Sequence, residues 1–226
     1  MNKAVDLKTL AVDEIGDAHL MSSAETPMRT DAFVLSEGEK MEKIAHHFEA
    51  IMETLGLDLT DDSLKGTPQR VAKMYVQEIF SGLLPDNKPR MAVFGNKYKY
   101  KEMLVEKNIE VYSTCEHHFL PIVGRAHVAY ISNGTVIGLS KINRIVQYYS
   151  KRPQVQERLV VQIAKALKEA LDTEDVAVLI EGKHLCVSSR GIEDTSSSTI
   201  TAEYGGTFKD PLVRNEFLTY VRTDLM

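Results

Sequence analysis

The residues best suited to chemistry in this chain are two short groups of cysteine and histidine. The first is Cys115-Glu116-His117-His118, and the second is His184-Leu185-Cys186. The sequence contains two cysteines, and each lies within three residues of a histidine. Thiolate and imidazole are the ligands that zinc prefers, and a tetrahedral site needs them brought together from separate segments. The pattern therefore predicts a metal centre built from two distant parts of the chain.

The number of ligands decides what such a centre does. Four protein ligands would make a closed structural site, whereas three ligands and a water would make a catalytic one. If Cys115, His118 and Cys186 bind the metal, His117 and His184 remain beside it as imidazoles that can move protons near neutral pH. The alternatives are a structural zinc knuckle, or two buried cysteines with unrelated histidines. The sequence has no paired Cys-x-x-Cys motif, which disfavours the knuckle.

Both groups are expected on or next to β-strands. Alternating apolar residues predict four strands, at about 103–115, 122–131, 175–187 and 194–207. The first two would form an antiparallel hairpin with Cys115 and His118 at its bend. Residues i and i+2 of a strand share a face, so His184 and Cys186 would point into the same space.

Helices are expected around these strands. Apolar residues at helical spacing predict helices that begin near Ser36, Thr67, Ser140, Val155 and Leu212. Ser36 with Glu39 forms a capping box, and Gly56 stops the first helix. Thr67 and Pro68 are interpreted as the N-cap and first residue of the second.

The order of these elements indicates an α+β fold. One antiparallel four-stranded sheet would carry a helix pair on one face (ββααββ), with an N-terminal helical extension. The turn-rich segment 84–89 divides the chain into an N-terminal arm and helical region, 1–88, and a catalytic domain, 89–226. Residues 1–35 lack a sustained period and are expected to be an irregular or partly helical arm, ordered by a neighbouring subunit. The second face and the edges of the sheet need cover, which favours a ring-shaped homo-oligomer.

The amino-acid composition argues against some classes of binding partner. The chain is 43% hydrophobic and 26% charged, as expected for an ordinary soluble globular protein. Its net charge of −5 does not favour nonspecific nucleic-acid binding. No run of about 18 apolar residues predicts a membrane span, and ligand-like cysteines imply a reducing compartment, so we expect a cytoplasmic protein. His46, His47 and His127 are interpreted as packing or surface residues.

Four motifs then resemble a known family. They are Cys115-Glu116-His117-His118-Phe119, Gly138 to Arg144 (GLSKINR), Arg152 to Leu159 (RPQVQERL), and His184 to Val187 with Arg190-Gly191. Together they resemble GTP cyclohydrolase I, from about residue 36 to about residue 222. The motifs are long and occur in order, so chance agreement is a poor explanation.

The resemblance implies a tunnelling fold assembled as a ring with active sites between subunits; bacterial members are typically decamers. It implies conversion of GTP and water to 7,8-dihydroneopterin triphosphate and formate, the entry to folate-type pterins. Cys115, His118 and Cys186 would hold Zn²⁺, and His117 and His184 would be the acid/base pair. The substrate would be bound by Gln156 and Glu157 at guanine and by Ser140, Lys141, Arg144, Arg190, Arg70 and Lys73 at the triphosphate.

The chemistry suits these residue types. A carboxylate such as Glu157 can accept hydrogen bonds from N1 and N2 of guanine side by side, a pair that adenine lacks. Lys141 and Arg144 lie in the first turns of a helix, whose N-terminus itself favours anions.

Two rival functions remain. One is another enzyme of the same fold, such as its nitrile reductase with a nicotinamide cofactor, and the other is a metal-stapled structural ring without activity.

Overall fold

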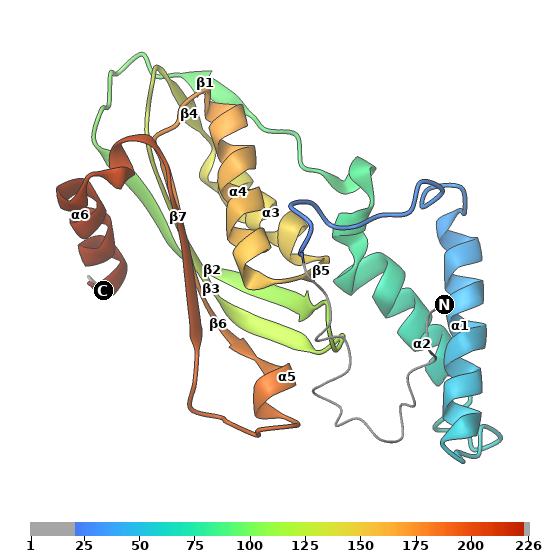
Figure 1. Ribbon diagram of the computed structural model, residues 1–226. Coiled ribbons are helices and arrows are strands. Elements are labelled where there is room, and N and C mark those ends of the chain that lie inside the picture. Colours follow the sequence, from blue (N-terminus) through green and yellow to red (C-terminus); the bar gives the residue numbers. More distant parts are fainter. Residues whose placement is uncertain (1–20, 224–226) are drawn as a thin grey trace.

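The structure, a computed structural model, describes residues 21–223 and is built around one β-sheet (Figure 1). Four strands are antiparallel to their neighbours and follow the order β2 (Met103–Cys115), β3 (Pro121–Ile131), β6 (Val176–His184) and β7 (Thr199–Tyr204). The predicted antiparallel sheet is thereby confirmed. A fifth strand, the two-residue β5 (Pro153–Gln154), pairs in parallel with the end of β2 and was not predicted.

The β2–β3 hairpin carries the first cysteine and histidine group at its bend. Its register runs from Met103 opposite Ile131 to Thr114 opposite Pro121. The bend is closed by backbone hydrogen bonds, because Cys115 N–H donates to Leu120 O at 2.8 Å. The predicted hairpin, with Cys115 and His118 at its bend, is therefore confirmed.

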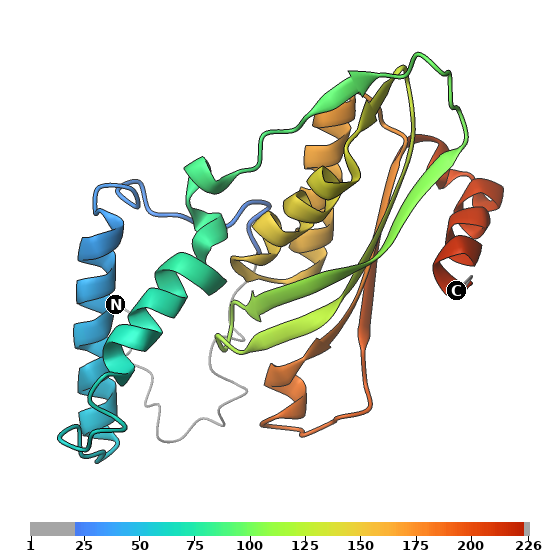
Figure 2. The same cartoon turned by 180° about the vertical axis from the view of Figure 1, so that it is seen from behind.

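The helix pair α3 (Leu139–Ser150) and α4 (Gln156–Leu171) covers one face of the sheet, as Figure 2 shows from behind. Apolar side chains from both helices and from β2, β3 and β6 form the main core, among them Val111, Val128, Ile142, Ile145, Leu159, Ile163 and Ile180. Burying each such side chain contributes about 1.5–3 kcal/mol. This core fixes α3 and α4 against the strands that carry the chemistry.

The opposite face of the sheet is partly covered by the chain's own C-terminal helix, α6 (Pro211–Arg222) (Figure 1). Phe208 and Phe217 are fully buried there and pack with Ala129 and Ala177. The sequence argument had left this whole face to neighbouring subunits. The structure shows that α6 of the same chain covers part of this face.

The N-terminal helical region stands beside α3 rather than on the sheet (Figures 1 and 2). In α1 (Glu37–Thr54) the predicted capping box is present in both directions between Ser36 and Glu39. Helix α2 (Thr67–Lys73) has Gly66 as its N-cap, so Thr67 is the first helical residue and not the cap. The helix then continues as a π-helix, Met74–Ile79, which apolar spacing did not predict.

One strand prediction needs correction. β6 ends at His184, and Cys186 lies in a helical turn, α5 (Leu185–Ser188), instead of a continuing strand. His184 pairs with Ile122 in the last pair of the β3–β6 ladder, so an extended chain beyond it would leave backbone groups unpaired. The helical turn provides partners, as Ser189 N–H donates to Leu185 O.

A small ladder was also missed, in which β1 (Val93–Gly95) pairs with β4 (Thr135–Ile137). Within the arm, residues 21–35 are irregular as predicted, and residues 1–20 lie outside the described part. Over 21–223, no helix combines the length and apolar character needed to cross a bilayer.

Candidate metal centre and active site

The hairpin bend and α5 bring together the three predicted metal ligands. Cys115 from the end of β2, His118 from the turn and Cys186 from α5 place one ligand atom each within 4.8 Å of one another. Both thiols are buried, and Ile122 packs against them from β3. His118 is exposed, so the cluster lies at the surface end of a small apolar core. The arrangement matches a site with soft donors and an accessible side.

The two thiols differ in acidity. Burial raises the pKa of Cys115, but hydrogen bonds from His184, from the His117 backbone and from His118 outweigh it and bring that pKa to about 5. Burial and the neighbouring Cys115 raise the pKa of Cys186 to about 11. One thiolate therefore forms readily in this cluster, while the second needs a cation beside it.

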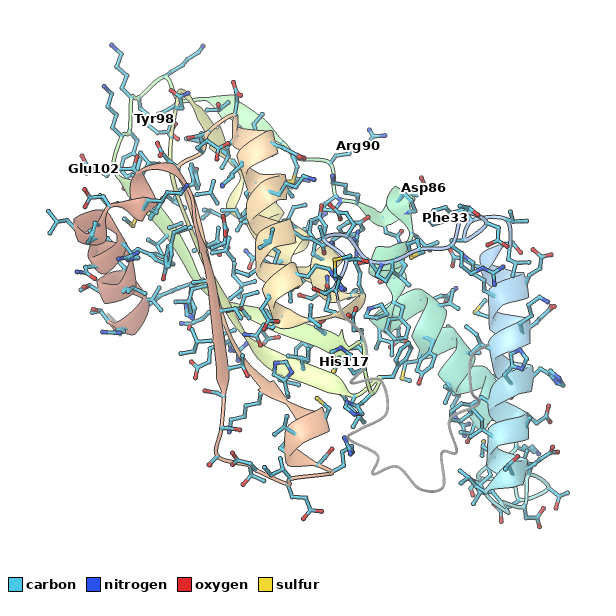
Figure 3. The ribbon with its side chains drawn as sticks, in the orientation of Figure 1. Phe33, Asp86, Arg90, Tyr98, Glu102 and His117 are labelled. Carbon is cyan, nitrogen blue, oxygen red and sulfur yellow. The ribbon has the colours of Figure 1, made fainter. Side chains whose placement is uncertain are left out.

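The two remaining histidines flank the cluster. His117 Nδ1 lies 3.8 Å from Cys115 Sγ, and its ring meets that of His118 edge to face at 6.5 Å. His117 is exposed at the hairpin bend (Figure 3). His184 approaches from the end of β6 and is half-buried. The structure thus brings all five cysteine and histidine side chains to one place.

Gln156 holds His184 from the other side. The Gln156 side chain is 1% exposed, and its Oε1 lies 2.9 Å from His184 Nε2. Its amide nitrogen donates to Ile180 O and Thr199 O. Gln156 is expected at the guanine edge, but the oxygen and the nitrogen of its amide form hydrogen bonds inside the protein.

Glu157, the other residue expected at guanine, is exposed at the start of α4. Because helical neighbours point in different directions, Glu157 faces solvent where Gln156 and Arg158 face the interior. Of the two residues expected at guanine, Glu157 is consequently the one whose side chain an incoming base could reach.

A buried ion pair that the sequence did not reveal supports the hairpin bend. Arg158 binds Glu116 through two hydrogen bonds, Nη1 to Oε2 at 2.6 Å and Nη2 to Oε1 at 3.0 Å. Their side chains are 4% and 21% exposed. This bidentate pair ties the residue between Cys115 and His117 to the first turn of α4. No sequence signal marks it, because the partners lie 42 residues apart.

The described end of the arm lies on the same helix. Arg158 Nε donates to Ser23 O at 2.8 Å, and Gln162 Nε2 donates to Glu25 Oε2 at 2.9 Å. Residues of the arm are thus held by their own chain, without requiring a neighbouring subunit at this point.

Phe119 follows His118 and shapes the turn. It has a φ of 56°, which is costly for an aromatic residue. Its ring packs edge to face on Phe80 with centroids 5.3 Å apart, and its N–H donates to Cys115 O. The metal loop is therefore anchored on the N-terminal helical region as well as on α4.

The expected phosphate residues fall into two groups. The cluster of Cys115, His118 and Cys186 is called the metal end below. Arg190 belongs to it, because Arg190 Nη1 lies 3.0 Å from His118 Nε2. Ser140 and Lys141 lie in the first turn of α3. The last turn of α3 leads into β5, where Gln154 pairs with Cys115, so this end of the helix lies beside the cysteine. At 1.5 Å rise per residue, ten residues of helix separate the two ends by about 15 Å. Ser140 and Lys141 therefore lie at the end of α3 opposite to the one that leads to β5 and Cys115.

The other expected phosphate cations lie on α2 and α3. Arg144 is exposed and lines a hollow of about 250 Å³ with Lys151 and Asn87. On α2, Arg70 donates to Ser63 O and Thr67 Oγ1, and Lys73 is exposed. These side chains are available for a ligand that reaches them from outside the chain.

Comparison with known proteins gives a consistent answer. Residues 44–222 match the family model described as GTP cyclohydrolase I. GTP cyclohydrolase 1 of Flavobacterium johnsoniae is 65% identical over 213 residues, 94% of this chain and 96% of that protein. GTP cyclohydrolase 1 of Aeromonas salmonicida is 57% identical over 195 residues, 86% of this chain and 88% of that protein.

Among solved structures, a dihydroneopterin aldolase from Burkholderia thailendensis bound to guanine aligns with 47% of this chain and 93% of its own. Its TM-score is 0.32 at 15% identity, which is too low to support an argument. The family model and the curated relatives cover the hairpin bend, both helices of the pair and α5. The chain belongs to the GTP cyclohydrolase I family.

Proposed function

We propose that this protein is a GTP cyclohydrolase I, which converts GTP and water to 7,8-dihydroneopterin triphosphate and formate. The observation that carries the proposal is the cluster of Cys115, His118 and Cys186, flanked by two further imidazoles, in a chain of this family. Three ligands and two neighbouring proton carriers are what a hydrolytic ring opening needs.

The donor set fits Zn²⁺. Bonds of about 2.3 Å to sulfur and about 2.0 Å to nitrogen would place tetrahedral ligands roughly 3.5–4 Å apart. The ligand atoms already lie within 4.8 Å, so side-chain rotations of modest size would close the cluster around an ion. A bound zinc ion would supply Lewis-acid activation of the water that attacks C8 of the purine.

His117 and His184 would transfer the protons. Protonation of N7 makes C8 more electrophilic, and opening of the imidazole ring requires further proton transfers. Both imidazoles lie next to the ligand cluster, His117 exposed and His184 half-buried. Groups in such roles are each worth about 10²–10⁴-fold in rate.

Glu157 would select guanine by accepting hydrogen bonds from N1 and N2. Ser140, Lys141, Arg144, Arg190, Arg70 and Lys73 would bind the triphosphate. Since the first turn of α3 lies about 15 Å along the helix from the end that leads to β5 and Cys115, we propose that Ser140 and Lys141 serve the site of a neighbouring subunit. This supports a homo-oligomer with active sites between subunits, and a decamer is the form we propose.

The rival functions are less well supported. A structural ring would close its metal site with four protein ligands, whereas the cluster within residues 21–223 contains three. A reductase of the same fold would use a cysteine as nucleophile, but we assign both cysteines of this sequence as ligands, because both lie in the cluster with His118.

The test is incubation of the purified, zinc-loaded protein with GTP. We expect stoichiometric formate and a pterin that becomes fluorescent on oxidation, and no product from ATP. Removal of zinc by a chelator should stop both products, and added zinc should restore them. Formate-free turnover, or no turnover by a fully metallated protein, would refute the proposal.

A further inference from the structure

Gln156 lies at the junction of three elements and is the most completely hydrogen-bonded side chain near the candidate site. Its amide nitrogen donates to Ile180 O at 3.1 Å, Thr199 O at 2.9 Å and Thr201 Oγ1 at 3.2 Å. Two of these acceptors are backbone carbonyls on β6 and β7, so α4 is fastened to both strands. With 1% exposure, the side chain has no open side toward a substrate.

These contacts fix which end of the amide faces His184. Backbone carbonyls only accept hydrogen bonds, so the end that meets Ile180 and Thr199 must be the amide nitrogen. The opposite end, 2.9 Å from His184 Nε2, is therefore the oxygen. An amide oxygen also only accepts, so His184 Nε2 must carry the hydrogen.

The backbone leaves space for this arrangement. Gly182, two residues before His184, has no side chain, and a Cβ added there would lie 2.6 Å from Gln156 Oε1. Such a contact is too close for any pair of carbon and oxygen atoms, so any larger residue at Gly182 would displace the amide. The strand therefore approaches Gln156 as closely as a glycine allows.

We infer that Gln156 is a positioning residue for His184, and not a guanine contact. It fixes the position and the orientation of the imidazole through the hydrogen bond that His184 Nε2 donates to Gln156 Oε1. Recognition of guanine then falls to the exposed neighbour, Glu157. This inference rests on the proposed function through the proton-transfer role of His184.

The kinetic test separates positioning from substrate contact. Gln156→Met keeps the length of the side chain and removes its polar atoms. We expect kcat to fall about 10²-fold or more while KM and the Kd for GTP change less than about threefold. Glu157→Gln is the matched comparison and should do the reverse, raising KM more than it lowers kcat. A Gln156→Met enzyme with raised KM and unchanged kcat, or with neither changed, would overturn the inference.

Gly182→Ala tests the same contact without altering either polar side chain. It should lower kcat like Gln156→Met, whereas Thr201→Val, which removes the longest of the hydrogen bonds of Gln156, should change kcat less than about threefold. Circular dichroism and the mass of the assembly would confirm that each variant is folded. Wild-type kcat in Gly182→Ala would contradict the inference.

A readout independent of turnover covers variants that fail to fold. Solid-state nuclear magnetic resonance of the wild-type protein labelled with ¹⁵N-histidine should show the hydrogen of His184 on Nε2, assigned by the loss of that signal in His184→Gln. Hydrogen on Nδ1 would overturn the inference even if the enzyme turns GTP over. Hydrogen on Nε2 would support it even if formate release, and with it the proposed function, were not observed.

Discussion

The metal end of the chain and the first turn of α3 hold their functional side chains in opposite ways. Around Cys115 and Cys186, the pairs Glu116–Arg158 and Gln156–His184 form within the same chain. At the start of α3, Ser140 is exposed and Lys141 half-buried, about 15 Å along the helix from its end beside β5. The first region is held by contacts within one chain, whereas the second offers side chains that we propose meet the substrate together with a neighbouring chain.

This difference assigns distinct consequences to mutations in the two regions. Side chains at the metal end are fixed by burial and hydrogen bonds, so their loss should alter metal binding or stability before substrate affinity. Side chains at the start of α3 carry little of the fold, so their loss should alter substrate affinity alone. The predictions below test that contrast.

The largest effect is expected from a metal ligand. Cys186→Ser should lower the zinc content from about one per chain toward zero and reduce turnover at least about 10³-fold, because the Lewis acid is worth several kcal/mol. Atomic absorption and formate release measure the two effects. Lys141→Ala is the control and should keep its zinc; loss of zinc there would erase the contrast.

Breaking the buried ion pair comes next. Arg158→Met leaves the Glu116 carboxylate without its bidentate partner and should cost about 3–5 kcal/mol of unfolding free energy. Urea unfolding at fixed protein concentration measures it. The exposed pair Arg125–Glu110 is a matched control, since Arg125→Met should cost less than about 1 kcal/mol. Equal costs for both pairs would show that the hairpin bend gains nothing from burial of its pair.

Loss of a single phosphate cation should be milder. Lys141→Ala should raise KM for GTP about 10–100-fold, corresponding to a charged hydrogen bond of about 1.5–3 kcal/mol. Zinc content and unfolding midpoint should match wild type. An unchanged KM would remove Lys141 from the triphosphate site.

The smallest expected effect concerns a histidine away from the metal. Burial lowers the pKa of His127, with Glu181 opposing this shift and Lys107 adding to it. A group whose pKa is lower in the folded state stabilises the fold above its unfolded pKa of about 6.5, and this stability is lost as the pH falls below that value. His127→Gln should therefore flatten the loss between pH 6.5 and 5.5, by up to about 1 kcal/mol in urea titrations. An unchanged slope would assign the acid sensitivity to other groups.

Much of the fold follows from local patterns in the sequence. Alternation and helical spacing located β2, β3, α3 and α4, because one face of each is buried in the core. The Ser36–Glu39 capping box was also readable, since its partners are three residues apart. Cys186 was misplaced in a strand because the end of β6 depends on where β3 stops, which is a tertiary property.

The candidate site was predictable in its residue types but not in its contacts. The five cysteine and histidine candidates could be read from their spacing, whereas the choice of Cys115, His118 and Cys186 among them came from the family resemblance. The pairing of Glu116 with Arg158 and of Gln156 with His184 spans 42 and 28 residues, so no local signal shows either. The left-handed backbone conformation of Phe119 likewise accompanies a ring contact with Phe80, which lies 39 positions earlier in the chain.

The central claim is that the metal end and the start of α3 serve one active site from different chains. Co-assembly of Cys115→Ala chains with Lys141→Ala chains tests it directly at a GTP concentration well below KM, where each variant alone should give at most about a tenth of the wild-type rate. A random equal mixture should recover about a quarter of the wild-type rate, since that share of sites pairs an intact metal centre with an intact Lys141. Mixed assemblies that remain as inactive as the separate variants would contradict it.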